Sequence, residues 1–273
     1  MDPPGFWPPH CGGQGRRGLA ASHSATAQIA AISAANGLRT LVVDLDPQGN
    51  STHYLLGNGA ENADDTIAGL FEQTLNFKFN PKKTTDFIHA TPYSGLAIMP
   101  SHPDLGDLQG KLESRYKIFK LRDALDELAD DFDAVFIDTP PALNFFTRSA
   151  LIATRLCLIP FDCDDFSRRA LYALLDNVQE IKADHNRDLQ VEGIVVNQFQ
   201  PRASLPQKLV QELIAEGLPH PERFIGLHFF SPANVMKLLE IVPIPDTAPE
   251  VLATGFALAR LLKKIPVQSG ICD

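Results

Sequence analysis

Short apolar segments alternate with longer, helix-like segments through the middle of the chain. The apolar segments, which end in polar residues, are 38–46, 96–101, 133–141, 156–162 and 191–199. Each is too uniformly apolar for a strand with one face in water and is typical of a parallel strand covered on both faces. Residues 25–37 and 117–131 lie between them and carry apolar residues at helical spacing. The alternation predicts an α/β fold with a doubly wound, mostly parallel sheet.

The two ends of the chain do not continue this pattern. Residues 1–23 follow neither a strand nor a helix period and carry prolines at positions 3, 4, 8 and 9, so we expect an irregular segment. From about residue 220 a new pattern begins, which predicts a short strand, a helix over about 248–263 and another strand. We therefore predict three parts with boundaries at 1–23, 24–219 and 220–273.

Composition and charge narrow the classes of protein that fit. The 273 residues are 44% hydrophobic, which is enough for a large core without disulfide or metal support. Lys and Arg number 24 against 33 Asp and Glu, and the net charge of −9 argues against a protein that coats nucleic acid with its whole surface, while leaving room for a local basic patch. The chain has neither a signal-like start nor an apolar run of about 18 residues, so we expect a cytoplasmic protein without membrane contact.

Carboxylates stand at the ends of two of the predicted strands. Asp44 and Asp46 end one strand, and Asp138 ends another. In a parallel sheet the ligand crevice lies beyond the carboxyl ends of the strands. Magnesium prefers hard oxygen ligands, so these residues are candidates for a magnesium–nucleotide site. The alternative is that the aspartates only cap the turns that follow the strands.

Four blocks of sequence carry a resemblance to a known family. They are, in chain order, VVDLDPQGNST, FDAVFIDTPPALNFFTRSAL, LIPFDCDDFSRRAL and GIVVNQFQPRASLPQKLVQEL. Together they resemble the ParA family of partition ATPases over about residues 24–218. The resemblance implies a P-loop NTPase fold of the deviant Walker type, with ATP and Mg²⁺ as cofactors. It also implies ATP-dependent homodimers, non-specific binding to DNA at the nucleoid, and a centromere-binding partner protein that stimulates hydrolysis during plasmid or chromosome segregation.

The same resemblance assigns roles to individual residues. Asp46 would position the attacking water, and Asp138 would hold magnesium through water. Asn197 would lie near the adenine, and Arg202 would fall in a region associated with DNA contact. For Asn197 and Arg202 the alternative reading is an ordinary polar residue without a ligand.

The phosphate-binding loop departs from the family pattern. The family form is KGGxGKT followed by Thr or Ser, whose backbone N–H groups, lysine and hydroxyl hold the phosphates and magnesium. By glycine content the matching window is residues 11–18, which makes the nucleotide-binding candidates Gly12, Gly13, Gly15 and Arg16. By gapless spacing the window is residues 17–24 instead. Neither window has the family's second lysine and its hydroxyl in place. The loss of such a lysine weakens nucleotide binding, because a charge about 4 Å from a phosphate oxygen is worth roughly 4 kcal/mol.

The strand that should precede this loop has no counterpart in the sequence either. GFWPPH is short, and its prolines cannot donate to a central ladder. We therefore expect a chain that does not hydrolyse ATP. Two hypotheses account for this: a frame-shifted or substituted N-terminus, or a natural degenerate paralogue that binds without hydrolysing.

The C-terminal part resembles a different family. RFIGLHFFSPANVMKLLEIV and PEVLATGFALARLLKKIPVQSGICD resemble the end of the NAD-binding domain of 3-hydroxyacyl-CoA dehydrogenases. That resemblance implies an acid/base dyad, for which His228 and Glu240 stand at the right spacing. No GxGxxG follows a predicted strand, so we expect the dyad to be vestigial. The alternatives to a partition ATPase are thus a dehydrogenase fragment or a non-functional fused product.

Overall fold

The chain folds into helices and strands that alternate as an α/β protein. The computed structural model describes residues 20–76, 79–162, 165–197, 225–229, 237–243, 246–261 and 264–268. The elements are α1 (Ala20–Ala35), β1 (Thr40–Asp44), α2 (Asn50–Leu56), η1 (Gly57–Asn62), α3 (Ile67–Leu75), η2 (Thr84–Phe87), β2 (His89–Ala90), β3 (Leu96–Met99), α4 (Leu105–Ser114), α5 (Lys120–Asp126), β4 (Ala134–Asp138), α6 (Phe145–Ala153), β5 (Leu156–Asp162), α7 (Asp165–Asp184), β6 (Gln190–Asn197), β7 (Ile225–Phe229), β8 (Leu238–Pro243), α9 (Pro249–Leu261) and β9 (Ile265–Gln268). The predicted α/β class is confirmed.

The chain divides into two compact units. One consists of Leu19–Cys157 and Tyr172–Glu192, and the other takes in the described residues of Leu158–Leu171 and those from Gly193 onward. None of the described helices combines the length and the apolarity that crossing a membrane requires.

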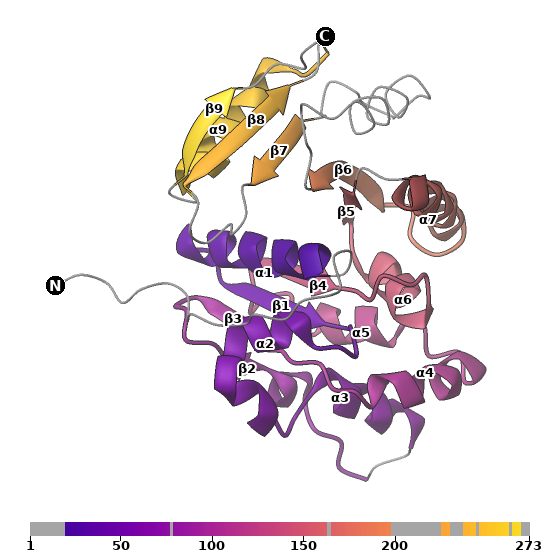
Figure 1. The fold of residues 1–273 in the computed structure, drawn as a ribbon. Helices are drawn as coiled ribbons and strands as arrows, with labels where there is room; N and C mark the ends of the chain where they lie inside the picture. Colours follow the sequence, from indigo (N-terminus) through magenta and orange to yellow (C-terminus); the bar gives the residue numbers. More distant parts are fainter. Residues whose placement is uncertain are drawn as a thin grey trace, which may run out of the picture. The chain divides into compact units, whose positions relative to one another are not determined.

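The first unit is built on a four-stranded sheet with the strand order β2-β3-β1-β4 (Figure 1). Strands β3, β1 and β4 run parallel, and β2 adds a two-residue antiparallel strand at one edge. The register of β1 and β4 places Asp44 directly opposite Asp138. The carboxyl ends of these two strands therefore lie together.

Helices cover both faces of this sheet. On one face, Ala27, Ala30 and Ala34 of α1 pack over Val42 of β1 and Ile98 of β3. The small alanine side chains let this helix approach the strands closely. On the other face, side chains of α3, α4, α5 and α6 form the main core with the remaining apolar strand residues: Leu41, Val43 and Met99, with Val135 and Ile137 at its border.

The five strands predicted for the middle of the chain all form, but they do not join into one described sheet. β5 and β6 form a separate two-stranded sheet. Where the sequence predicted a helix over 117–131, the structure has the shorter helix α5, which covers Lys120–Asp126. Its core contacts are nevertheless helical in spacing, since Leu121 and Ala124 are buried.

The C-terminal residues form a third sheet with the order β7-β8-β9. β7 and β8 are antiparallel, β8 and β9 are parallel, and α9 follows β8 and packs on it through Ala259. The predicted helix and final strand are present, but the chain forms two strands before the helix where the sequence predicted one. At Gly255 an added Cβ would lie 2.9 Å from Cδ1 of Ile225, so glycine lets α9 approach the sheet closely.

Helix α4 ends in a motif that normally contains glycine. The amide of Tyr116 donates to the Glu113 carbonyl and that of Lys117 to the Leu112 carbonyl, which is the Schellman pattern. Tyr116 has a φ of 54° and is 89% exposed, so its side chain gains little packing in a conformation that costs an L-residue about 1 kcal/mol.

We predict that Tyr116→Gly stabilises the protein by about 0.5–1 kcal/mol, because glycine adopts this conformation without the Cβ clash. The measurement is the midpoint of urea denaturation. Tyr116→Ala is the matched control: it removes the same ring but keeps the Cβ, and its midpoint should not rise. An equal rise in both variants would show that the exposed ring, and not the backbone, sets the cost.

Candidate functional site

Three carboxylates converge where the parallel strands β1 and β4 end. Asp44 and Asp138 are paired in the sheet register, and the Leu45 amide donates to the Asp138 carbonyl at 2.8 Å. Asp46 follows two residues after Asp44. Asp44, Asp46 and Asp138 expose 0%, 2% and 4% of their surface. Three buried acids in one place require donors or cations around them.

Asp44 accepts hydrogen bonds from the residues that follow β1. Its Oδ2 accepts from the Thr52 amide at 2.8 Å and from the Thr52 hydroxyl at 2.7 Å, and its Oδ1 accepts from the Asp46 amide at 3.1 Å. Thr52 lies in the first turn of α2, where backbone N–H groups are free to donate. The chain after β1 therefore folds back to solvate the acid at the strand's end.

Asp138 receives its hydroxyl donors from two different helices. Ser51 of α2 donates to Oδ2 at 2.7 Å, and Thr26 of α1 donates to Oδ1 at 3.4 Å. Since these residues are 87 and 112 positions away in sequence, the contacts join both helices to the end of β4.

A tight turn places Asp46 beyond the strand. The Gln48 amide donates to Asp46 Oδ1 at 3.0 Å, the Gly49 amide donates to the Asp46 carbonyl at 2.8 Å, and the Ser101 hydroxyl donates to the same carbonyl. Gly49 has a φ of 62°, which glycine adopts without strain, and leads directly into α2. The side chain of Asp46 is therefore held by local backbone geometry rather than by a long flexible loop.

Burial raises the pKa of Asp44 from its usual value to about 7, and the charge of the neighbouring Asp138 adds to the effect. The hydrogen bonds from Thr52 and Asp46 oppose the rise. Asp44 therefore changes its charge near neutral pH.

The oxygen donors of this cluster suit magnesium and do not suit a softer metal. Carboxylates and hydroxyls are the hard ligands that magnesium takes, often through water. No group of three or more His, Cys, Asp or Glu that could hold a metal ion directly occurs in the described parts of the chain. Of the predicted site residues, Asp46 and Asp138 are thus buried carboxylates of this cluster, while the phosphate-binding candidates Gly12, Gly13, Gly15 and Arg16 lie outside the described residues.

The remaining predicted site residues lie elsewhere. Asn197 is the last residue of β6, and Arg202 lies outside the described residues. His228 and Glu240 occupy directly opposite positions in the antiparallel register of β7 and β8. This register explains how a spacing of twelve brings the two positions together.

The sequence predicted the aspartates of this site but not the residues that donate hydrogen bonds to them. Ser51 and Thr52 could have been noticed, because hydroxyl residues at the start of a helix next to a strand-end aspartate are common donors. Thr26 and Ser101 carry no such signal. Ser101 follows β3, and its amide donates to the Thr52 hydroxyl at 2.9 Å, so its part in the network depends on the fold.

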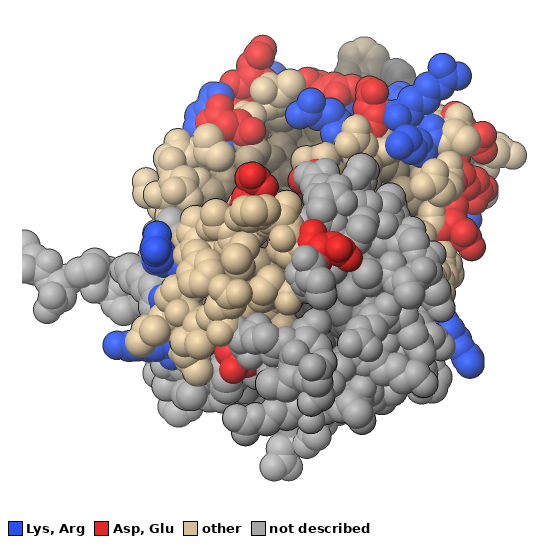
Figure 2. Space-filling model, turned by 90° about the horizontal axis from the view of Figure 1, so that it is seen from above, with Lys and Arg blue, Asp and Glu red and all other residues tan. Residues whose placement is uncertain are grey.

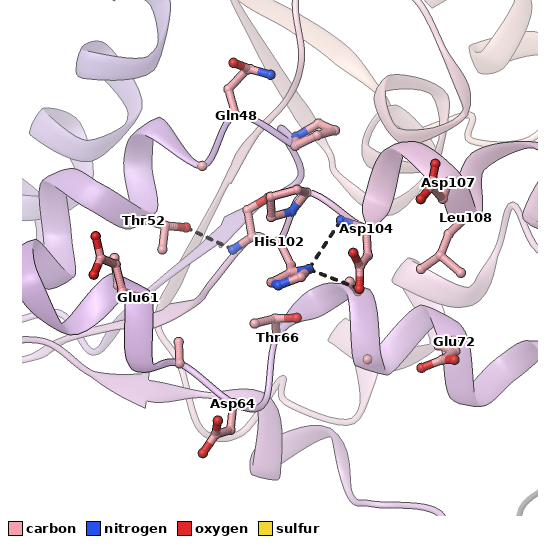
Figure 3. Close-up of a pocket in the computed structure, with 18 of the residues that line it drawn as sticks. Gln48, Thr52, Glu61, Asp64, Thr66, Glu72, His102, Asp104, Asp107 and Leu108 are labelled. Atoms are coloured by element: carbon pink, nitrogen blue, oxygen red, sulfur yellow. Dashed lines mark hydrogen bonds and ion pairs between the residues drawn. The ribbon is translucent and has the colours of Figure 1, made fainter.

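A pocket of about 870 Å³, drawn in Figure 3, is lined in part by the turn that follows Asp46. Gln48, Thr52 and Ser101 contribute to its wall, but the three strand-end aspartates do not. Its other lining residues include the charged side chains of Glu61, Asp64, Glu72, Asp104, Asp107 and Lys111. A wall with this excess of carboxylates disfavours a polyanion such as a triphosphate unless cations accompany it.

The charges of the described residues are mixed on the face drawn in Figure 2. Lys and Arg side chains lie next to Asp and Glu side chains there, without a continuous basic area among the described residues. The described residues on this face therefore form no basic surface of the kind expected to contact DNA.

Two family models match the sequence. The model of the AAA domain matches residues 16–191, and the model of the 3-hydroxyacyl-CoA dehydrogenase NAD-binding domain matches residues 203–272.

Curated relatives match about two thirds of this chain. The chromosome partitioning protein ParA of Myxococcus xanthus is 34% identical over 186 residues, which cover 68% of this chain and 63% of that protein. The sporulation initiation inhibitor protein Soj of Bacillus subtilis is 30% identical over 179 residues, covering 65% of this chain and 67% of that protein. The chain thus spans less than two thirds of the length of the Myxococcus protein.

Solved structures with the same fold cover more of the chain. Cobyrinic acid a,c-diamide synthase from Mycobacterium smegmatis, with bound ADP and magnesium, is 23% identical, with a TM-score of 0.67 and coverage of 89% of both chains. A plasmid partition protein from Borrelia burgdorferi is 19% identical, with a TM-score of 0.61 and coverage of 89% of this chain and 93% of that one. At these identities the likeness shows the P-loop NTPase fold.

We predict that Asp44→Asn removes a pH dependence of folding. Because the pKa of Asp44 is raised to about 7 in the folded state from 3.8, folding loses stability as the pH rises between these values. The free energy of unfolding of Asp44→Asn relative to the unmodified protein should therefore increase by on the order of 2–4 kcal/mol between pH 4 and pH 8. Urea denaturation across this range measures it.

Asp133→Asn is the control, since a hydrogen bond from Arg39 lowers the pKa of Asp133 to about 2. Its stabilising charge is lost only as the pH falls below 3.8, so its difference from the unmodified protein should stay constant above pH 4. A constant difference for Asp44→Asn as well would contradict the predicted titration.

Proposed function

Because the chain belongs to the ParA family of partition ATPases, we propose that it is a partition protein that keeps the carboxylate half of a magnesium–nucleotide site but does not hydrolyse ATP. The observation that carries the proposal is the convergence of Asp46 and Asp138 at the carboxyl ends of β1 and β4. Both acids are buried and held in place by hydrogen bonds from the protein itself. Such preorganisation is what a site for a charged ligand requires.

Each acid has a role that its position supports. Asp138 would hold magnesium through water while Ser51 keeps its carboxylate in place at 2.7 Å. Asp46 would orient a water molecule, since its carboxylate is fixed by the turn at Gln48. Bound magnesium would supply the positive charge that offsets the phosphates of the nucleotide.

The residues that should contact the phosphates support binding without hydrolysis. In the window with the family's glycines, Arg16 stands where the family has its second lysine and Arg17 where it has the magnesium-binding hydroxyl. Arg16 can restore a charge but not a hydroxyl. These two substitutions support the proposal that the chain binds nucleotide weakly and does not hydrolyse it.

The same proposal gives this chain the binding partners that the family has. Nucleotide-dependent homodimers would bind DNA non-specifically at the nucleoid of the cytoplasm, with Arg202 at the DNA and Asn197 near the adenine. A centromere-binding protein would be the partner, and a plasmid or a chromosome the cargo. His228 and Glu240 would remain without catalytic function, because the sequence that precedes them contains no nucleotide fingerprint after a strand.

The proposal is tested by the affinity of the purified chain for ATP, measured by calorimetry with magnesium and with a chelator. In a second protein, residues 1–23 are replaced by an apolar strand followed by KGGxGKTT. We expect this variant to bind ATP at least tenfold more tightly than the natural chain, because it restores the magnesium-binding hydroxyl and the strand before the loop, which Arg16 cannot replace. The natural chain should release no phosphate.

Variants of the replaced protein assign the roles. Asp138→Asn should weaken magnesium-dependent binding about tenfold or more, and Asp46→Asn should abolish hydrolysis without loss of binding. Asp65→Asn is the control, since Asp65 forms a surface ion pair with Lys82 away from the strand ends. If the replaced protein binds no nucleotide, the assignment of a nucleotide site is wrong. If the natural chain releases phosphate from ATP and Asp46→Asn abolishes this release, the proposal that the natural chain is inactive is wrong.

A further inference from the structure

Helix α3 begins at a residue that is suited to cap it but does not. Thr66 has the extended backbone of a cap residue, with φ −117° and ψ 168°, and threonine is among the residues that commonly cap a helix. Its hydroxyl nevertheless makes no capping hydrogen bond. Among the described residues the hydroxyl has no other hydrogen-bond partner, although Thr66 is only 6% exposed. The hydroxyl is therefore a buried polar group that the protein leaves unused.

Two backbone amides in the first turn of α3 are unused as well. The amides of Ala68 and Gly69 donate to none of the residues that the structure describes. The amides on either side of them do donate, that of Ile67 to the Pro100 carbonyl at 2.9 Å and that of Leu70 to the carbonyl of the cap residue at 3.2 Å. Buried donors without a partner are rare and point to a ligand or to ordered water.

The three unused donors belong to the wall of the pocket drawn in Figure 3. Thr66, Ala68 and Gly69 all line this space of about 870 Å³, and the Thr66 side chain points from the start of α3 into it. The volume lies in the range of pockets that bind small molecules. Because amides at a helix N-terminus attract oxyanions, this end of the pocket fits a carboxylate.

The rest of the pocket wall has the opposite charge. Glu72 of α3 and Asp107 of the neighbouring helix α4 form no ion pair with a described residue. Asp104 lies 3.3 Å from the imidazole of His102, which also lines the pocket. In all, the wall contains five carboxylates and one lysine: Glu61, Asp64, Glu72, Asp104, Asp107 and Lys111. Such a wall favours a ligand with positive charge.

We propose that this pocket binds a dibasic amino acid. Its α-carboxylate accepts hydrogen bonds from the Thr66 hydroxyl and from the amides of Ala68 and Gly69, and its two cationic groups lie among the carboxylates of the wall. A molecule with one carboxylate and two positive charges matches both the three donors and the excess of acids. The proposal concerns the folded chain alone and does not depend on nucleotide binding.

Three other occupants fit less well. A simple carboxylate matches the donors, but the five acids of the wall repel it. A divalent cation matches the acids but cannot accept a hydrogen bond, and the described residues contain no group of three or more His, Cys, Asp or Glu that could hold a metal ion. Water alone pairs with the donors but leaves the charge of the wall uncompensated.

The probes are L-lysine, L-ornithine and L-arginine, each titrated into the full-length chain without nucleotide. Calorimetry measures the affinity, and the amide resonances of Ala68 and Gly69 locate the ligand by NMR. We expect at least one probe to bind with a Kd of about 1 mM or lower, which a ligand of about ten non-hydrogen atoms can reach. It should shift both resonances. The corresponding amine without the carboxylate (cadaverine, putrescine or agmatine) should bind at least tenfold more weakly, as should L-glutamate.

Thr66→Val removes the hydroxyl and keeps the shape of the side chain. It should weaken binding of the amino acid about tenfold, because a hydrogen bond to a charged group is lost. The midpoint of urea denaturation should not fall, since the hydroxyl makes no hydrogen bond within the protein. Thr74→Val is the matched control: its hydroxyl donates to the Phe71 carbonyl of the same helix at 2.7 Å and does not line the pocket, so its affinity should be unchanged.

A second pair of variants tests the acidic part of the wall. Glu72→Gln should weaken binding, whereas Glu113→Gln, on α4 but outside the pocket, should not. Failure of all three amino acids to bind saturably would overturn the proposal, because the donors would then be met by water only. Equal binding of the amine without the carboxylate, or of L-glutamate, would overturn it as well. If Thr66→Val does not fold, these comparisons and the two amide shifts decide the matter with the unmodified protein.

Discussion

The site depends on the parallel pairing of β1 with β4. Their register sets Asp44 opposite Asp138, and two acids at the ends of adjacent strands cannot both be buried as charges without compensation. The surrounding structure provides it through hydroxyl and amide donors from α2, and through Thr26 of α1. The need to compensate Asp44 and Asp138 connects the loop after β1, the start of α2 and the placement of α1. The raised pKa of Asp44 is the part of the cost that the donors do not offset.

Much of the four-stranded sheet was predictable from sequence, because its strands are buried on both faces and their apolar runs are unmistakable. The sequence pattern also predicted the acids at the strand ends, since a charged residue that interrupts such a run is conspicuous. It could not predict Thr26 and Ser101 as donors, because they reach the site only through the packing of α1 and the end of β3. It also could not reveal that β4 ends the sheet formed by the described residues, since AVFI reads the same whether one neighbour or two are present.

The C-terminal sheet shows a different limit of sequence reasoning. The helix over Pro249–Leu261 was predictable from its apolar spacing, whereas β7 and β8 were read as one strand. Their antiparallel pairing gives structural meaning to the twelve-residue spacing of His228 and Glu240, because residues in register across two strands need not be close in sequence. The register therefore places the two positions of the predicted dyad opposite each other in the backbone.

The hydroxyl contact between Thr26 and Asp138 has a consequence for protein engineering. Helix α1 is already anchored to the sheet by its own side chains, both through this contact and through the alanines that pack over β1 and β3. A change at Thr26 would therefore alter the docking of α1 and the donor set of Asp138 together, so the two cannot be engineered independently.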